Sequence, residues 1–455
     1  MSRTLKVFAI VGLAASVAAC GTVRNVWPFN RDQAAAVASA GERISIIGLD
    51  QTVTPTPSLA GRDFFLPAPR AVTSWPLPGG NTDQVLEHVA GGENMQIAWR
   101  RNIGQGASRT TQVTSPVVAS DGRIYVMDGE STVVAVDAQS GAILWRQNIR
   151  PQTRDRNSFG GGLAVAGDRV YASSGYRVTV ALDAASGAIV WSSPNDSPVR
   201  GAPTVAGDRV YVVDIDNQIL AYNRADGSLA WSYQAIAEPA RIMRASSPAV
   251  TGDTVIAPFS SGELVALRAS NGSQLWTQVL SRTSRTNALS ELRDISGRPA
   301  VFRGSVYAIS HSGVMAAMDV RTGAPTWSLP LAGTSAPWVA GDVVYAVSTA
   351  GELVTVNRAN GQVYWVRNLN EGRERRRGGF LGVGARTERP VWTGPILASN
   401  RLLLVNSRGQ MISLDPKTGV ENGALNLGAP AYIAPIAYNG ALYVLTDNGQ
   451  LISIR

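Results

Sequence analysis

The residues that could carry out chemistry are few in this chain. It has one cysteine, Cys20, and two histidines, His88 and His311, among 455 residues. No Cys or His cluster has the spacing of a metal site, and no nucleophile elbow or phosphate-binding loop pattern occurs. We therefore expect no catalytic residue, no metal site and no bound cofactor, and we expect His311 to be an exposed turn residue.

Acidic and amide side chains recur ahead of glycines that are spaced along the chain: Asp137, Asp183, Asn223, Asp319, Asn357 and Asp415. Glycine is favoured in such turns because it takes positive φ freely. An aspartate or asparagine ahead of it can accept hydrogen bonds from the backbone of its own turn. We interpret these carboxylates as turn chemistry and not as catalytic acids.

The cysteine follows a segment typical of exported lipoproteins. Arg3 and Lys6 precede an apolar stretch at 7–15 that is too short to span a bilayer, and the sequence 17–20, Val-Ala-Ala-Cys, resembles a lipobox. We expect residues 1–19 to be a lipoprotein signal peptide and Cys20 to be acylated. Lipoproteins of this class without an aspartate after the cysteine reach the outer membrane, which implies anchoring there with the rest of the chain in the periplasm. An ordinary secretory signal cut nearby is the alternative.

Tryptophans recur at intervals of 38 to 51 residues: Trp99, Trp145, Trp191, Trp231, Trp276, Trp327 and Trp365. All but the first stand four residues after a glycine. This is the period of one four-stranded propeller blade. We expect each tryptophan to lie on an outer strand and to pack as a large apolar plate between neighbouring blades.

Eight copies of the repeat can be counted. Seven first strands are marked by proline and the second copy has Gly161-Gly162 instead, but the eighth copy ends at Arg455 with three strands. Residues 95–100 carry Trp99 without a blade of their own. We therefore predict an all-β fold over 95–455: an eight-bladed β-propeller of four-stranded antiparallel blades, whose ring is closed by an N-terminal strand completing the last blade. The seventh copy lacks its tryptophan near 421–423, so its outer strand has the weakest signal.

The composition of residues 20–94 differs from that of the repeats. It includes an alanine-rich stretch at 33–40 and a proline-rich tract at 55–78. Such composition favours a lipid-anchored extended tether that partly drapes over the ring, rather than a second folded core.

The formal net charge is +8, and the densest basic run is 373–377, with Arg386 and Arg389, around a glycine-rich stretch. This run is either a solvated loop or a contact for an acidic partner or anionic head groups. Basic charge alone does not indicate nucleic-acid binding, which fits an exported lipoprotein poorly. We expect no nucleic-acid partner.

The blade pattern resembles the PQQ-type repeat of quinoprotein dehydrogenases and of the BamB family of outer-membrane assembly lipoproteins. The dehydrogenase resemblance implies a quinone on the ring axis, beside a disulfide of adjacent cysteines and acidic and amide ligands to calcium. Cys20 is the only cysteine, so that pair cannot form; a PQQ-dependent periplasmic dehydrogenase remains the alternative function. The lipobox, the eight blades and the ring closure are all similar to the BamB family.

That family resemblance implies a non-catalytic scaffold. It would dock on the periplasmic domains of the barrel-forming (BamA-like) subunit, assist the folding and insertion of outer-membrane proteins and touch nascent ones, with its lipid anchor in the membrane. The family's partner-binding loops fall on Arg241, Met243 and Arg244, and on Asp294 and Ser296. Both segments follow outer strands at adjacent blade junctions, so they should form one patch. The alternative is that Arg244 and Asp294 merely pair with each other.

A third interpretation is a binding module for envelope polysaccharide. It requires an aromatic cluster on one rim of the ring. Trp75, Trp338 and Trp392 do not occupy the blade position of the repeat. They are the candidates for such a cluster.

Overall fold

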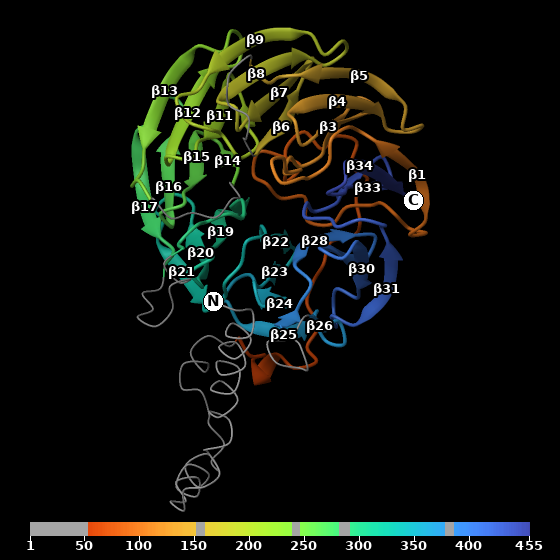
Figure 1. The fold of residues 1–455 in the computed structure, drawn as a ribbon. Helices are drawn as coiled ribbons and strands as arrows, with labels where there is room; N and C mark the ends of the chain where they lie inside the picture. The colour runs from red at the N-terminus through yellow and green to blue at the C-terminus, as the bar shows by residue number, and fades with distance from the viewer. Residues whose placement is uncertain (1–52, 152–159, 239–245, 282–291, 378–385) are drawn as a thin grey trace, which may run out of the picture. The chain divides into compact units, whose positions relative to one another are not determined.

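The computed structural model describes residues 53–151, 160–238, 246–281, 292–377 and 386–455. Within the unit 51–455 these residues form eight four-stranded antiparallel sheets arranged as blades around a ring (Figure 1). The predicted all-β, eight-bladed propeller is confirmed. A short 3-10 helix, η2 (Pro57–Leu59), precedes the blades.

The strands follow each other through the blades in chain order, from the inner strand to the outer one. Blades 1 to 4 consist of β2 (Val118–Ser120), β3 (Arg123–Met127), β4 (Thr132–Asp137) and β5 (Ile143–Asn148); β6 (Gly161–Ala166), β7 (Arg169–Ser174), β8 (Val178–Asp183) and β9 (Ile189–Pro194); β10 (Thr204–Ala206), β11 (Arg209–Val213), β12 (Gln218–Asn223) and β13 (Leu229–Gln234); and β14 (Ala249–Thr251), β15 (Thr254–Pro258), β16 (Glu263–Arg268) and β17 (Gln274–Val279).

The second half of the ring repeats this order. Blades 5 to 8 consist of β18 (Ala300–Phe302), β19 (Ser305–Ile309), β20 (Met315–Asp319) and β21 (Pro325–Leu329); β22 (Trp338–Ala340), β23 (Val343–Val347), β24 (Glu352–Asn357) and β25 (Val363–Asn368); β28 (Trp392–Ala398), β29 (Arg401–Asn406), β30 (Gln410–Leu414) and β31 (Glu421–Asn426); and β32 (Ile436–Tyr438), β33 (Ala441–Leu445), β34 (Gln450–Ile454) and β1 (Ile97–Asn102). A separate hairpin pairs β26 (Arg375–Arg377) with β27 (Arg386–Glu388).

The ring closes by joining the two ends of the propeller sequence. Strand β1 pairs antiparallel with β34 and supplies the outer strand of blade 8, so the last sheet also has four strands (Figure 1). The outer strand of blade 7, whose sequence signal was weakest, is present as well. Strand β31 pairs with β30 from Gln410↔Asn426 to Leu414↔Glu421, with one bulge.

Neighbouring blades contact each other through one repeated tryptophan–glycine pair. A Cβ atom added to Gly187 would lie 2.6 Å from the ring of Trp145 in the preceding blade. The indole of Trp145 donates a hydrogen bond to the Ala184 carbonyl, at 3.0 Å. The same stacking joins Trp99 to Gly141, Trp191 to Gly227, Trp231 to Gly272, Trp276 to Gly323, Trp327 to Gly361 and Trp365 to Gly419. The predicted role of tryptophan as an interblade plate is therefore confirmed.

Two glycines allow this interblade contact to be tested. Gly187 has φ +76° and packs against Trp145, whereas Gly207 has φ +57° and no atom within 4 Å of an added Cβ. Both alanine variants carry the strain of positive φ, but only Gly187→Ala also overpacks the interface. We expect Gly187→Ala to lower the free energy of unfolding by about 1–3 kcal/mol more than Gly207→Ala does. Urea unfolding followed by tryptophan fluorescence measures both. Equal losses would contradict the packing role.

The repeated aspartates make the turn hydrogen bonds expected of them. Asp137 Oδ1 accepts hydrogen bonds from the Ser140 backbone N–H at 2.8 Å and from the Ser140 hydroxyl at 2.7 Å. These bonds hold the pKa of Asp137 below its usual value. Asp183 and Asp319 have the same arrangement with Ser186 and Thr322, and the same lowered pKa. These carboxylates stabilise turns.

Residues 70–92, which we call the axial segment, run along the inner strands instead of staying outside the ring. Trp75 exchanges two backbone hydrogen bonds with Ala119 of β2, at 2.7 and 2.8 Å. Further backbone bonds join the segment to other blades: Val165 N–H to Pro76 O, Val250 N–H to Thr82 O, Val301 N–H to Asp83 O, Val89 N–H to Leu397 O and Asn439 N–H to Val72 O. The axial segment therefore links inner strands that are distant in sequence.

Candidate partner-docking site

The structure describes only part of the predicted docking patch. Asp294 and Ser296 lie in the connection between β17 and β18, and both are buried, with exposed fractions of 3% and 9%. Arg241, Met243 and Arg244, like Cys20, lie outside the described residues. The docking role of these residues, including a contact between Arg244 and Asp294, stays a prediction.

The connection that carries Asp294 and Ser296 is held by three blades. The Ile295 N–H donates to Phe259 O in blade 4 at 3.2 Å, and the His311 N–H of blade 5 donates to Asp294 O at 2.9 Å. The Ser296 hydroxyl is 3.5 Å from Thr334 O, ahead of blade 6. These contacts fix the segment although it contains no strand. His311 does lie in a turn, but it is half-buried and not exposed as expected, because the turn rests on this segment.

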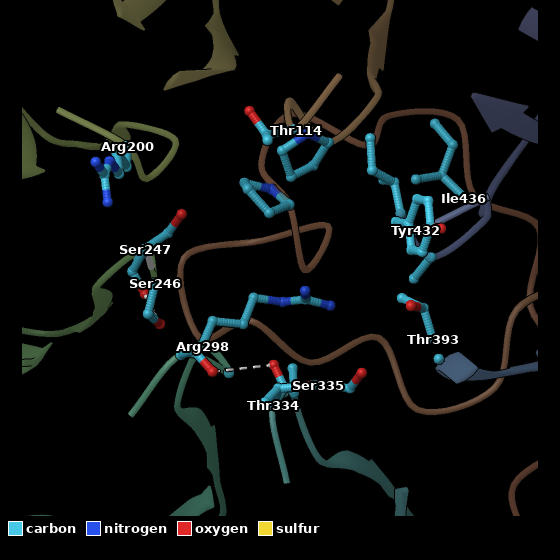
Figure 2. Close-up of a pocket in the computed structure, with 18 of the residues that line it drawn as sticks. Thr114, Arg200, Ser246, Ser247, Arg298, Thr334, Ser335, Thr393, Tyr432 and Ile436 are labelled. Atoms are coloured by element: carbon cyan, nitrogen blue, oxygen red, sulfur yellow. Dashed lines mark hydrogen bonds between the residues drawn. The ribbon is translucent and has the colours of Figure 1, made fainter. Parts of the chain in front are cut away.

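The described ends of both predicted docking segments line one pocket. Ser246 and Ser247 are at the end of the first segment (Figure 2), Ser296 ends the second, and Gly297 and Arg298 directly follow it. The pocket has a volume of about 160 Å³. Its other lining residues include Pro78 of the axial segment and residues at or shortly before the starts of inner strands from several blades, such as Pro116, Thr393 and Ile436. We call it the axial pocket, because such positions surround the ring axis.

The axial pocket does not offer the donor set that the dehydrogenase resemblance implies. Its described lining contains hydroxyl groups, arginines and apolar side chains, but no carboxylate, amide or thiol. Within the described ranges, no group of three or more His, Cys, Asp and Glu side chains could hold a metal ion. Calcium prefers several carboxylate and carbonyl-type oxygen ligands. The residues present therefore do not fit a calcium-bound quinone in this pocket.

The tryptophans considered for a polysaccharide site are buried. Trp75, Trp338 and Trp392 are exposed by only 1%, 4% and 4%. Trp75 stacks on Trp338, with ring centroids 6.5 Å apart. These side chains therefore cannot form an exposed aromatic cluster on the rim.

Part of the basic run is held by contacts within the fold. The Arg373 guanidinium donates to both carboxylate oxygens of Glu421, at 2.7 and 2.6 Å, and lies over the Trp392 ring. Arg389 pairs with Glu374 at 2.8 Å. At these positions the run is neither a fully solvated loop nor a free cationic surface, since its charge is partly compensated.

Sequence reasoning missed the two features nearest the axis. It did not anticipate the backbone contacts of the axial segment, and it passed over Arg298 and Thr393 of the axial pocket. One signal was present for Arg298: it directly precedes Pro299, one of the prolines that mark first strands. A residue in that position lies at the inner end of a blade and therefore close to the axis.

The tryptophan–glycine contacts and the closure by β1 define the class of protein: an eight-bladed propeller built from PQQ-type repeats. A family model described as outer membrane protein assembly factor BamB matches residues 93–156 and 129–367, more than half of the sequence. The chain therefore belongs to this family. No helix in the described parts is long and apolar enough to cross a membrane.

Individual relatives agree with that membership. The chain is 26% identical to BamB of Alkalilimnicola ehrlichii over 212 residues, which are 46% of this chain and 51% of the relative. It is 22% identical to BamB of Escherichia coli over 210 residues, which are 46% of this chain and 49% of the relative. The matched stretch thus spans about half the length of these relatives.

Among solved structures, BamB from Moraxella catarrhalis superposes with a TM-score of 0.66 at 21% identity, covering 78% of this chain and 98% of that one. Quinohemoprotein alcohol dehydrogenase from Comamonas testosteroni superposes with a TM-score of 0.64 at 13% identity, covering 84% of this chain and 80% of that one. At these identities the superpositions show a shared fold only.

Proposed function

We propose that the chain is a non-catalytic scaffold lipoprotein of the outer-membrane β-barrel assembly complex. The observation that carries this proposal is the match of the BamB family model over most of the blades. Acylated Cys20 would anchor the chain in the outer membrane and keep the propeller in the periplasm. There the ring would dock on the periplasmic domains of the barrel-forming subunit and assist the folding and insertion of outer-membrane proteins.

The proposed docking patch comprises residues 241–247 and 292–296. Since Asp294 and Ser296 are buried and their segment is bonded to three blades, this half of the patch is preorganised before binding. Preorganisation reduces the entropy lost when a partner docks. The neighbouring Arg293 is exposed and can contact a partner directly. We assign Asp294 a positioning role in the patch, because its side chain is covered.

Co-purification tests this proposal. The full chain, tagged at its C terminus, would be expressed in its native envelope, solubilised in mild detergent and recovered by affinity. We expect the barrel-forming subunit to be recovered with it and to be absent from a control that carries an unrelated tagged outer-membrane lipoprotein. Recovery of the tagged chain without that subunit, in a detergent that preserves the complex, would refute the proposal.

A further inference from the structure

Arg298 extends into the axial pocket, where no residue in the described ranges forms an ion pair with it. Figure 2 shows its guanidinium reaching the middle of the pocket, across from Thr393. A Cβ atom added to Gly79 of the axial segment would lie 2.8 Å from Arg298 Nε, so only glycine leaves room for this arrangement. The shape of the axial segment therefore directs the guanidinium toward the open space of the pocket.

The charge of Arg298 is not compensated by any described residue. The ion pairs between described residues do not include it, and the described lining of the pocket contains no carboxylate. Its Nε is buried and has no hydrogen-bond partner among the described parts of the chain. Burial lowers the pKa of Arg298 to about 10, which still leaves the group charged at neutral pH. By exposure Arg298 as a whole is half-buried. A partly desolvated cation without a described anionic partner is energetically costly, and an anion would offset that cost.

A second polar group in the pocket is also unsatisfied. The Thr393 hydroxyl oxygen is buried and makes no hydrogen bond to any residue that the structure describes. Ser246, Ser247 and Ser296 add further hydroxyls to the lining. The hydroxyls of Ser246 and Ser296 donate to the Ser247 and Thr334 carbonyls over long distances, 3.5 Å each. Buried polar groups in folded proteins are nearly always satisfied, so two such donors lining one cavity suit a ligand that accepts hydrogen bonds.

We propose that the axial pocket binds a small oxyanion of the carboxylate or phosphate class, held by Arg298 and Thr393. Guanidinium presents a planar fork of N–H donors that matches the paired oxygens of either group. The Thr393 hydroxyl donates to the same anion from the opposite side. The volume of about 160 Å³ is sufficient for a small molecule or ion.

Calorimetric titration of the full chain in detergent tests this site. Inorganic phosphate and succinate serve as separate probes, with chloride added to keep the ionic strength constant. We expect one saturable site per chain for at least one probe, and the comparison of the two probes identifies the preferred class. If neither anion shows saturable binding to the wild-type chain, the proposal is overturned without reference to any variant.

Substitutions then locate the site. Arg298→Gln should weaken binding by about ten-fold or more, because it removes charge-assisted hydrogen bonds. Arg298→Lys should have a smaller effect, since it keeps the charge but loses the fork. Arg321→Gln, in an exposed turn, is the matched control and should bind as the wild type does. Unchanged affinity in Arg298→Gln would place the anion elsewhere and refute the assignment.

A further variant keeps the test valid if Arg298→Gln does not fold, as judged by far-UV circular dichroism. Thr393→Val preserves the shape of the side chain and removes only the hydroxyl. We expect it to weaken binding several-fold while the circular dichroism spectrum stays unchanged. An affinity equal to that of the wild type would exclude Thr393 from the site.

Discussion

Replacing Trp75 by alanine is expected to lower the free energy of unfolding by about 3–5 kcal/mol, the usual range for a fully buried tryptophan. Trp75 lies outside the blades, in the axial segment, yet it is exposed by only 1%. Its ring stacks on Trp338 of β22, and its backbone bonds to β2. The variant would therefore leave a cavity between elements of blades 1 and 6.

The matched control for Trp75→Ala is Phe65→Ala, in the same N-terminal part of the chain. Phe65 is 60% exposed, and its backbone N–H donates to Asp342, a bond that the substitution keeps. We expect this control to change stability by less than about 0.5 kcal/mol. Guanidinium-induced unfolding followed by circular dichroism measures both variants. Similar stabilities for the two would show that the axial segment adds little to the fold.

Arg244→Glu is expected to abolish co-purification with the barrel-forming subunit. In the proposed patch Arg244 binds a carboxylate or carbonyl of the partner, and reversing its charge replaces attraction by repulsion. Removing one member of a charged interface pair typically weakens binding by about 2–5 kcal/mol. Arg321→Glu, a charge reversal in an exposed turn away from the patch, should leave recovery unchanged. Full recovery with Arg244→Glu would show that the patch is wrongly assigned.

Asp294 requires a milder substitution. Its side chain is buried, so arginine at this position would disturb the fold as well as the interface. Asp294→Asn removes the charge and keeps the size. If Asp294 positions the docking segment, this variant should reduce recovery of the partner without abolishing it, while the far-UV circular dichroism spectrum stays the same. Unchanged recovery would indicate that the carboxylate has no part in docking.

The blades were predictable because their signals are local and repeated. Most copies place an aspartate or asparagine, a glycine and a tryptophan at fixed positions, and the structure uses them as a turn acceptor, a positive-φ residue and an interblade plate. The closure by β1 followed from counting, since one copy lacked an outer strand and one tryptophan lacked a blade. Even blade 7 formed its outer strand without the tryptophan, because pairing with β30 does not depend on that side chain.

The burial of Trp75, Trp338 and Trp392 was not predictable in the same way. Their positions outside the repeat suggested a rim cluster, whereas the axial segment covers Trp338 and buries Trp75. The Trp338 indole donates to Glu87 O at 2.6 Å, across 251 residues of sequence. Such a contact leaves no periodic pattern, because it occurs once and joins two segments that have different neighbours in sequence.

The sequence by itself determined the blade count, the turns and the interblade tryptophans, since these depend on short local patterns that recur along the chain. The closing strand followed from counting the strands of these repeats. Only the tertiary structure decided the course of the axial segment and the meeting of Arg298 and Thr393 in the axial pocket. In the axial segment, for example, the Gly91 N–H donates a hydrogen bond to the Ser399 hydroxyl, 308 positions away in the sequence. The pocket arises only when the ring has closed and brings the inner ends of separate blades together.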